Sequence, residues 1–195
     1  MDTRVLLDIL HLAERLKDTT RHSYTTQRRH ESVAEHSWRA ALMALLLRDE
    51  FPEADMDKVI RMCLIHDLGE AFTGDIPAFE KTGEDEQKEE ELLDRWVASL
   101  PAGLSAEWAE LYREMGERKT LEAKIYKAID GLEAVIQHNE SPIDTWIPHE
   151  YEMNVTYADD KVSFSPYLVR LREEIRKDTL AKIENESPVR AEDEA

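Results

Sequence analysis

Four ionisable residues, in the order His36, His66-Asp67 and Asp130, form the part of this sequence best suited to metal chemistry. Each of the three segments places its ionisable residues among apolar neighbours. Buried charges need a partner, and one metal ion bound by all four groups would meet that need. Two imidazoles and two carboxylates suit a divalent transition metal with positions left for water and substrate. We therefore predict a metal site built from these four residues.

Helices must bring these ligands together, because a helical period dominates the apolar pattern. Ser32 and Glu35 have the S-x-x-E spacing of a capping box. This spacing predicts a helix that starts at Ser32 and runs to about residue 51. His36 would then lie in its first turn.

The His66-Asp67 pair lies near the end of a second predicted helix, residues 56–68, for which Gly69 is a plausible C-cap. Adjacent residues of a continuous helix diverge by about 100°. The two side chains can therefore share an ion most easily at a helix end, where the backbone is less constrained.

The rest of the chain is also mostly helical in pattern. Ser165 and Pro166 are well suited to start the last helix, as N-cap and first helical residue. Only residues 154–164 look extended, which predicts a short β-hairpin turning at Asp159-Asp160. The predicted fold class is all-α, a compact multi-helix bundle, with further helices at about residues 3–17, 85–100, 105–115, 120–139 and 166–183.

The ordered pattern H…HD…D, followed by Glu-Ala-Phe-Thr-Gly-Asp at residues 70–75, resembles the HD-domain metal-dependent phosphohydrolases. The resemblance is greatest to their 5'-deoxynucleotidase-like branch and runs from about Leu12 to about Asn139. Dinuclear members usually carry further histidines between the His-Asp pair and the last aspartate, and none stands between Asp67 and Asp130. The resemblance thus implies one divalent ion, with Mn, Co, Zn, Ni, Fe and Mg left open.

A phosphate ester would need cationic groups, and the basic stretch at residues 17–30 supplies them. Arginine suits phosphate because its planar fork donates two parallel hydrogen bonds. The resemblance singles out Arg21 as the phosphate-binding arginine. The family often has a sugar-contacting tryptophan in the next position, where this chain has His22, so the preference for deoxyribose over ribose stays open. The stretch contains one acid, Asp18. Its basic residues are Lys17, Arg21, His22, Arg28, Arg29 and His30.

Two acids, Glu70 and Asp75, come shortly after the His-Asp pair in the sequence. Glu70 would hydrogen-bond the metal-bound water or act as general acid or base, and Asp75 would orient substrate or assist that transfer. The resemblance supports both positions and leaves the division of labour between them open.

Composition sets limits on partners and location. The 195 residues predict one domain, with a metal-site core at about 12–139, a C-terminal loop and helix at 140–184 and a short flexible tail at 185–195. The net charge of −18 argues against a nucleic-acid polymer as partner. No apolar run approaches a membrane span, and the single cysteine, Cys63, fits the cytoplasm. A homodimer is expected from the resemblance, with Trp146, Tyr151 and Tyr157 covering either the core or the dimer interface.

The leading hypothesis is a metal-dependent phosphomonoesterase that hydrolyses nucleoside 5'-monophosphates, deoxynucleotides above all, to nucleoside and phosphate. An HD-type iron oxygenase is one alternative, which the lack of intervening histidines disfavours. A non-catalytic nucleotide-binding or sensor HD domain is the other, and the complete ligand set with Glu70 argues against it.

Overall fold

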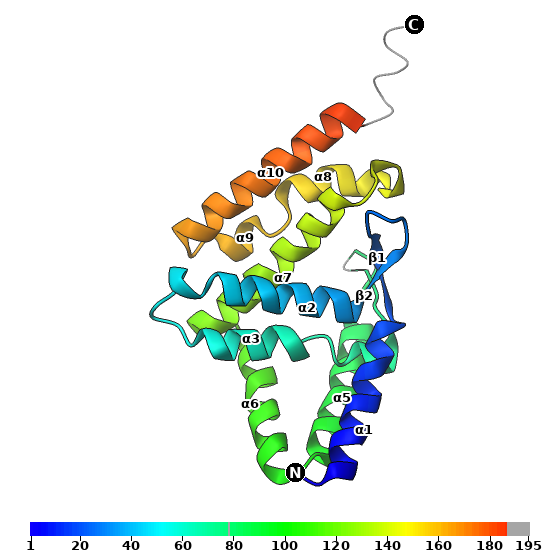
Figure 1. Cartoon of the computed structure of the whole chain (residues 1–195), viewed down its shortest axis with the longest axis vertical. Coiled ribbons are helices and arrows are strands. Elements are labelled where there is room, and N and C mark those ends of the chain that lie inside the picture. Colours follow the sequence, from blue (N-terminus) through cyan, green and yellow to red (C-terminus); the bar gives the residue numbers. More distant parts are fainter. Residues whose placement is uncertain (78, 187–195) are drawn as a thin grey trace, which may run out of the picture. The chain divides into compact units, whose positions relative to one another are not determined.

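The computed structural model describes residues 1–77 and 79–186 and is all-α apart from one two-stranded hairpin, so the predicted fold class is confirmed (Figure 1). The chain divides into two compact units. Of the described residues, the first unit contains 1–22, 31–77 and 79–127, and the second contains 23–30 and 128–186. Every helix among the described residues is too short or too polar to cross a membrane.

The first unit contains the segments that carry most of the predicted site. The hairpin pairs β1 (Thr20–Tyr24) with β2 (His30–Ser32), and each strand continues from one unit into the other. The helical elements in chain order are α1 (Thr3–Glu14), η1 (Arg15–Lys17), α2 (Val33–Leu46), η2 (Arg48–Glu50), α3 (Met56–Ile65), α4 (Glu70–Thr73), α5 (Gly83–Ser99), α6 (Ala102–Glu117) and the first residues of α7 (Leu121–Glu140).

Helices α2 and α3 pack side by side in this unit (Figure 1). Ala40 and Ala44 of α2 are almost completely buried. Val59 and Met62 of α3 are inaccessible to solvent. This packing fixes α3, and with it the segment that follows its last residue, Ile65.

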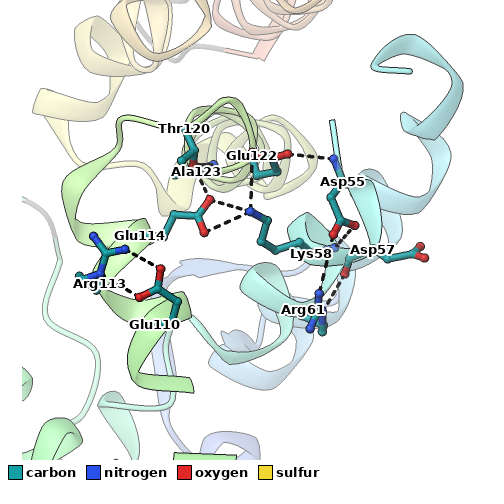
Figure 2. Close-up of polar contacts among 10 residues, drawn as sticks. All are labelled: Asp55, Asp57, Lys58, Arg61, Glu110, Arg113, Glu114, Thr120, Glu122 and Ala123. Carbon is teal, nitrogen blue, oxygen red and sulfur yellow. Dashed lines mark hydrogen bonds and ion pairs between the residues drawn. The ribbon is translucent and has the colours of Figure 1, made fainter. Parts of the chain in front are cut away.

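A polar network connects α3 to α6 and to the first turn of α7 (Figure 2). The Lys58 ammonium lies 3.0 Å from Oε1 of Glu114 on α6 and 3.8 Å from Oε2 of Glu122 on α7. Glu122 also accepts a hydrogen bond of 2.9 Å from the backbone N–H of Asp55, the N-cap residue of α3. Glu114 is buried, so the ion pair compensates a charge that would be costly to leave alone.

The second unit contains the remainder of α7, η3 (Ile143–Thr145), α8 (Pro148–Thr156), α9 (Asp159–Val162) and α10 (Pro166–Glu186). Helix α10 packs on α8 and α9. Its Arg172 is 1% exposed and donates hydrogen bonds to the backbone carbonyls of Tyr157 and Asn154. Trp146 is buried and donates to the carbonyl of His138, so this residue belongs to the core.

The predicted hairpin at residues 154–164 is wrong, because this segment forms the end of α8 and then α9. Valine and tyrosine favour strands locally, but Arg172 takes up the carbonyls at the end of α8, and Ala158 turns the chain with φ of 69°. The strands instead lie at residues 20–24 and 30–32. These segments are polar and show no alternation of polar and apolar residues, so the sequence did not indicate strands there. Arg28, with φ of 63°, lies in the turn between them.

The other helix predictions hold to within a few residues. The capping box of Ser32 and Glu35 is confirmed, and the hydroxyl of Ser165 accepts from the backbone of Leu168 at the start of α10. Gly69 as a C-cap is wrong: α3 ends at Ile65, and Gly69 has helical dihedral angles before α4. Of the predicted tail, residues 185 and 186 end α10 and residues 187–195 lie outside the described residues.

Candidate metal centre

Three of the four predicted metal ligands come together within the first unit. His36 lies in the first turn of α2, and the capping box fixes the residue at which this helix starts. The His36 side chain is fully buried. His66 and Asp67 follow the last residue of α3. Ligand atoms of these three residues all lie within 4.8 Å of one another.

The backbone changes its hydrogen-bond pattern where the His-Asp pair lies. From the carbonyl of Ile65 onward, the amides of Leu68, Glu70 and Phe72 donate to carbonyls three residues earlier. Such bonds tighten the turn relative to an α-helix and change the angle between successive side chains. The expectation that the pair lies at a helix end is confirmed.

A backbone contact orients the imidazole of His66. Its Nδ1 lies 2.9 Å from the carbonyl oxygen of Cys63. A carbonyl can only accept, so Nδ1 carries the proton and the lone pair of the neutral ring is on Nε2. That Nε2 lies 3.2 Å from Nε2 of His36 and 3.0 Å from Oδ2 of Asp67.

The donor set fits a divalent metal ion. Metal–ligand bonds of about 2.0–2.2 Å place neighbouring ligand atoms about 2.8–3.6 Å apart, for geometries between octahedral and tetrahedral. The separations of 3.0 and 3.2 Å fall within this range, and the 3.7 Å between His36 and Asp67 lies just above it. Such a convergence of donors is stabilised by a metal ion between them, or by a proton on one of the two imidazoles.

Arg21 on β1 adds a cation beside this group of ligands. Its Nη1 lies 3.9 Å from Oδ2 of Asp67, and its Nε lies 3.3 Å from Oε2 of Glu31 on β2. The Arg21 side chain is 16% exposed, so its position is largely fixed by packing. A guanidinium held next to a metal ligand is well placed to bind an anion that also reaches the ion.

Glu70, the first residue of α4, is buried, and its Oε2 makes no hydrogen bond to any described residue. Burial, together with the charges of Asp67 and Asp75, raises the pKa of Glu70 to about 10, while Arg21 acts in the opposite direction. A bound divalent cation would lower this pKa, because it favours the carboxylate. Glu70 is therefore a carboxyl group whose protonation depends on the charges around it.

Asp75 follows α4 and is largely buried as well. The pKa of Asp75 is raised, and burial is the largest cause. Arg21 and His36 act to lower this pKa, whereas the charge of Asp67 acts to raise it. Both predicted catalytic acids thus interact with the predicted ligands and with Arg21.

His22 and Asp130 have different surroundings. The ring of His22 packs edge-on against Phe79, with 5.5 Å between the ring centroids. Asp130 lies half-buried on the part of α7 that belongs to the second unit, and its role as fourth ligand stays a prediction from the sequence.

Several residues that contact this site were not predicted. Glu31 is buried beside Arg21, and the ring of Tyr126 packs against that of His66. The Tyr112 hydroxyl donates a 2.7 Å hydrogen bond to the carbonyl of Ile65. Only Glu31 left a signal in the sequence, as an acid directly before the helix of His36.

Similarity to known proteins shows the family of this chain. The model of the HD domain family matches residues 13–171. Human 5'-deoxynucleotidase HDDC2 is 33% identical over 141 residues, which cover 70% of this chain and 68% of the relative. The 5'-deoxynucleotidase hdd1 of Schizosaccharomyces pombe is 29% identical over 140 residues, covering 68% and 70% of the two chains.

Among solved structures, a predicted metal-dependent phosphohydrolase from Magnetospirillum magnetotacticum MS-1 is similar over 92% of this chain and 93% of its own. The TM-score is 0.77 and the sequence identity 26%. The extent of the family match and the identity to the human relative both establish that this chain belongs to the HD-domain family.

Proposed function

We propose that this protein is a metal-dependent phosphomonoesterase that hydrolyses nucleoside 5'-monophosphates, deoxynucleotides in particular, to nucleoside and phosphate. The relatives named as 5'-deoxynucleotidases support the reaction and the substrate class. The observation that carries the proposal is the placement of Arg21 beside three converging ligand atoms of His36, His66 and Asp67. Such a site joins a metal position to a phosphate-binding cation.

We assign the ion to His36, His66 and Asp67, with Asp130 added on the strength of the sequence pattern. When bound, one divalent ion would polarise phosphoryl oxygens and lower the pKa of a water molecule. The two imidazoles act as neutral donors, and the Cys63 carbonyl keeps His66 in the tautomer that has its lone pair on Nε2.

We assign the substrate's phosphate to Arg21 and its sugar to the neighbourhood of His22. Arg21 is preorganised by Glu31, which reduces the entropy lost when the phosphate binds. Glu70 and Asp75 are the groups available for proton transfer and substrate orientation, because both are carboxyl groups with raised pKa values. Glu70 is the better candidate for proton transfer, since its buried Oε2 makes no hydrogen bond to any described residue and can therefore bind a substrate or water.

We further propose that the protein is a cytoplasmic homodimer. Cys63 is buried and is the single cysteine of the sequence, which is consistent with a reducing compartment. The exposed face of α2 offers apolar area to a second copy, because Trp38 is 61% and Leu46 74% exposed. Light scattering coupled to size-exclusion chromatography of the purified chain measures the oligomeric state directly.

A screen of phosphate release tests the activity. Deoxyribonucleoside and ribonucleoside 5'-monophosphates would be incubated with chelator-treated protein reloaded with Mn²⁺, Co²⁺, Zn²⁺, Ni²⁺, Fe²⁺ or Mg²⁺. We expect phosphate release that requires a metal and is abolished by His66→Ala. Tight nucleotide binding without turnover would indicate a sensor domain, and oxygen uptake by the iron form without phosphate release would indicate an oxygenase.

A further inference from the structure

Gly69 lies between the metal-ligand pair and Glu70, yet its backbone does not require glycine. Its φ of −57° and ψ of −33° are accessible to any residue. The reason for glycine is space: a Cβ at this position would lie 2.9 Å from Cγ and 3.0 Å from Oε1 of Glu89. The side chain of Glu89, from α5, therefore lies directly on the backbone of the turn that carries His66, Asp67 and Glu70.

Glu89 also makes a second contact, with the segment that follows Asp75. Its Oε2 lies 2.7 Å from the ammonium of Lys81, and the two side chains are 17% and 21% exposed. Burial lowers the pKa of Lys81, but the hydrogen bond to Glu89 and the charges of Glu89, Glu70 and Asp67 together raise it. Lys81 is thus held as a cation within electrostatic reach of Glu70 and Asp67.

We propose that Glu89 is a positioning residue for the site: it braces the Gly69 turn and fixes the ammonium of Lys81 through their ion pair. Glu89 acts through these two segments and is not itself a ligand or an acid of the reaction. The catalytic part of this inference rests on the proposed function, whereas the Gly69–Glu89 contact does not depend on it.

A cycle of Gly69→Ala and Glu89→Ala in the full-length, metal-loaded protein tests the contact without an activity assay. In the wild-type background, the added methyl group must displace Glu89, so Gly69→Ala should lower the melting temperature. In the Glu89→Ala background, the methyl group has room. The same substitution should then leave the melting temperature unchanged or raise it, because alanine loses less backbone entropy than glycine in a helical conformation.

The positioning role is tested by the kinetics of Glu89→Ala and Lys81→Met. Each should lower kcat about tenfold with KM changed less than about twofold, because phosphate recognition is assigned to Arg21 and not to either of these residues. The double variant should be little worse than Glu89→Ala, since that substitution already removes the ion pair with Lys81. Glu90→Ala is the matched control: it is the next residue of α5, is exposed, and should leave kcat unchanged.

The outcomes separate the two proposals. Equal effects of Gly69→Ala on the melting temperature in both backgrounds would overturn the contact. A non-additive cycle with wild-type kcat in Glu89→Ala would overturn the positioning role. Absence of phosphate release from the wild-type protein with every metal would remove the proposed function and the kinetic role with it, while the melting-temperature cycle would still decide whether the contact exists.

Discussion

The imidazole Nδ1 of His66 donates a hydrogen bond to the backbone carbonyl of Cys63, three residues earlier, over 2.9 Å. This bond is made at the C-terminal end of α3, so the helix end itself selects the tautomer of the predicted metal ligand. The lone pair on Nε2 then faces His36 and Asp67.

Removal of a ligand should remove the ion and the activity together. We expect His66→Ala and Asp130→Ala each to lose bound metal, measured by elemental analysis after gel filtration, and to melt at a lower temperature because metal binding favours the folded state. His11→Ala, an exposed histidine of α1, is the control and should keep its metal. Full occupancy in a ligand variant would exclude that residue from the metal site.

Arg21→Ala should keep the metal and weaken phosphate recognition. A charge-assisted hydrogen bond contributes about 1.5–3 kcal/mol, which corresponds to a loss of about ten- to a hundredfold in kcat/KM. Arg4→Ala, which breaks only an exposed ion pair with Asp8, should have no effect on kcat/KM. An unchanged kcat/KM for Arg21→Ala would transfer phosphate recognition to another group, such as Arg28 or Arg29.

Glu70→Gln preserves the size of the side chain and removes its ability to exchange a proton. With saturating metal, kcat should fall roughly 10²–10⁴-fold while metal content stays stoichiometric. Both quantities must be measured on the same preparation, because loss of the ion would also abolish turnover. Near-normal kcat in the metal-loaded variant would leave proton transfer to Asp75 or to the metal-bound water.

The same residue should make the stability of the chelator-treated protein depend on pH. Folding raises the pKa of Glu70 from an ordinary 4.5 to about 10. The stabilisation linked to its proton is complete below the lower value and is lost as pH rises toward the higher one. Glu70→Gln cannot titrate, so its melting temperature relative to wild type should increase between about pH 5 and about pH 9. A constant difference over this range would contradict the raised pKa.

Lys58→Met should destabilise the fold, because it leaves the buried carboxylate of Glu114 without its cation. We expect a loss of about 1–3 kcal/mol in the free energy of unfolding, measured with urea. Arg61→Met is the control on the same helix. Its ion pair with Glu107 is 47% exposed on both sides, so its loss should cost less than about 1 kcal/mol. Equal losses in the two variants would show that burial of the Lys58 pair has no energetic consequence.

The sequence by itself located the helices of ten or more residues and supplied the four candidate ligands. The apolar period and the Ser32–Glu35 capping box located α2 with His36 in its first turn, because capping and periodicity act within a few residues of chain. The His66-Asp67 pair could be expected at a helix end on the same local grounds.

Only the tertiary structure decided how the site is supported. Glu31 beside Arg21, Glu89 on Gly69 and the hydrogen bond from Tyr112 to Ile65 join residues that local patterns do not relate. The assignment of residues 154–164 as strands failed for the same reason: carbonyl groups near Ala158 are bound by Arg172, which lies 14 or more residues away along the chain. A residue's local preference amounts to tenths of a kcal/mol, and burial with hydrogen bonding to a distant partner outweighs it.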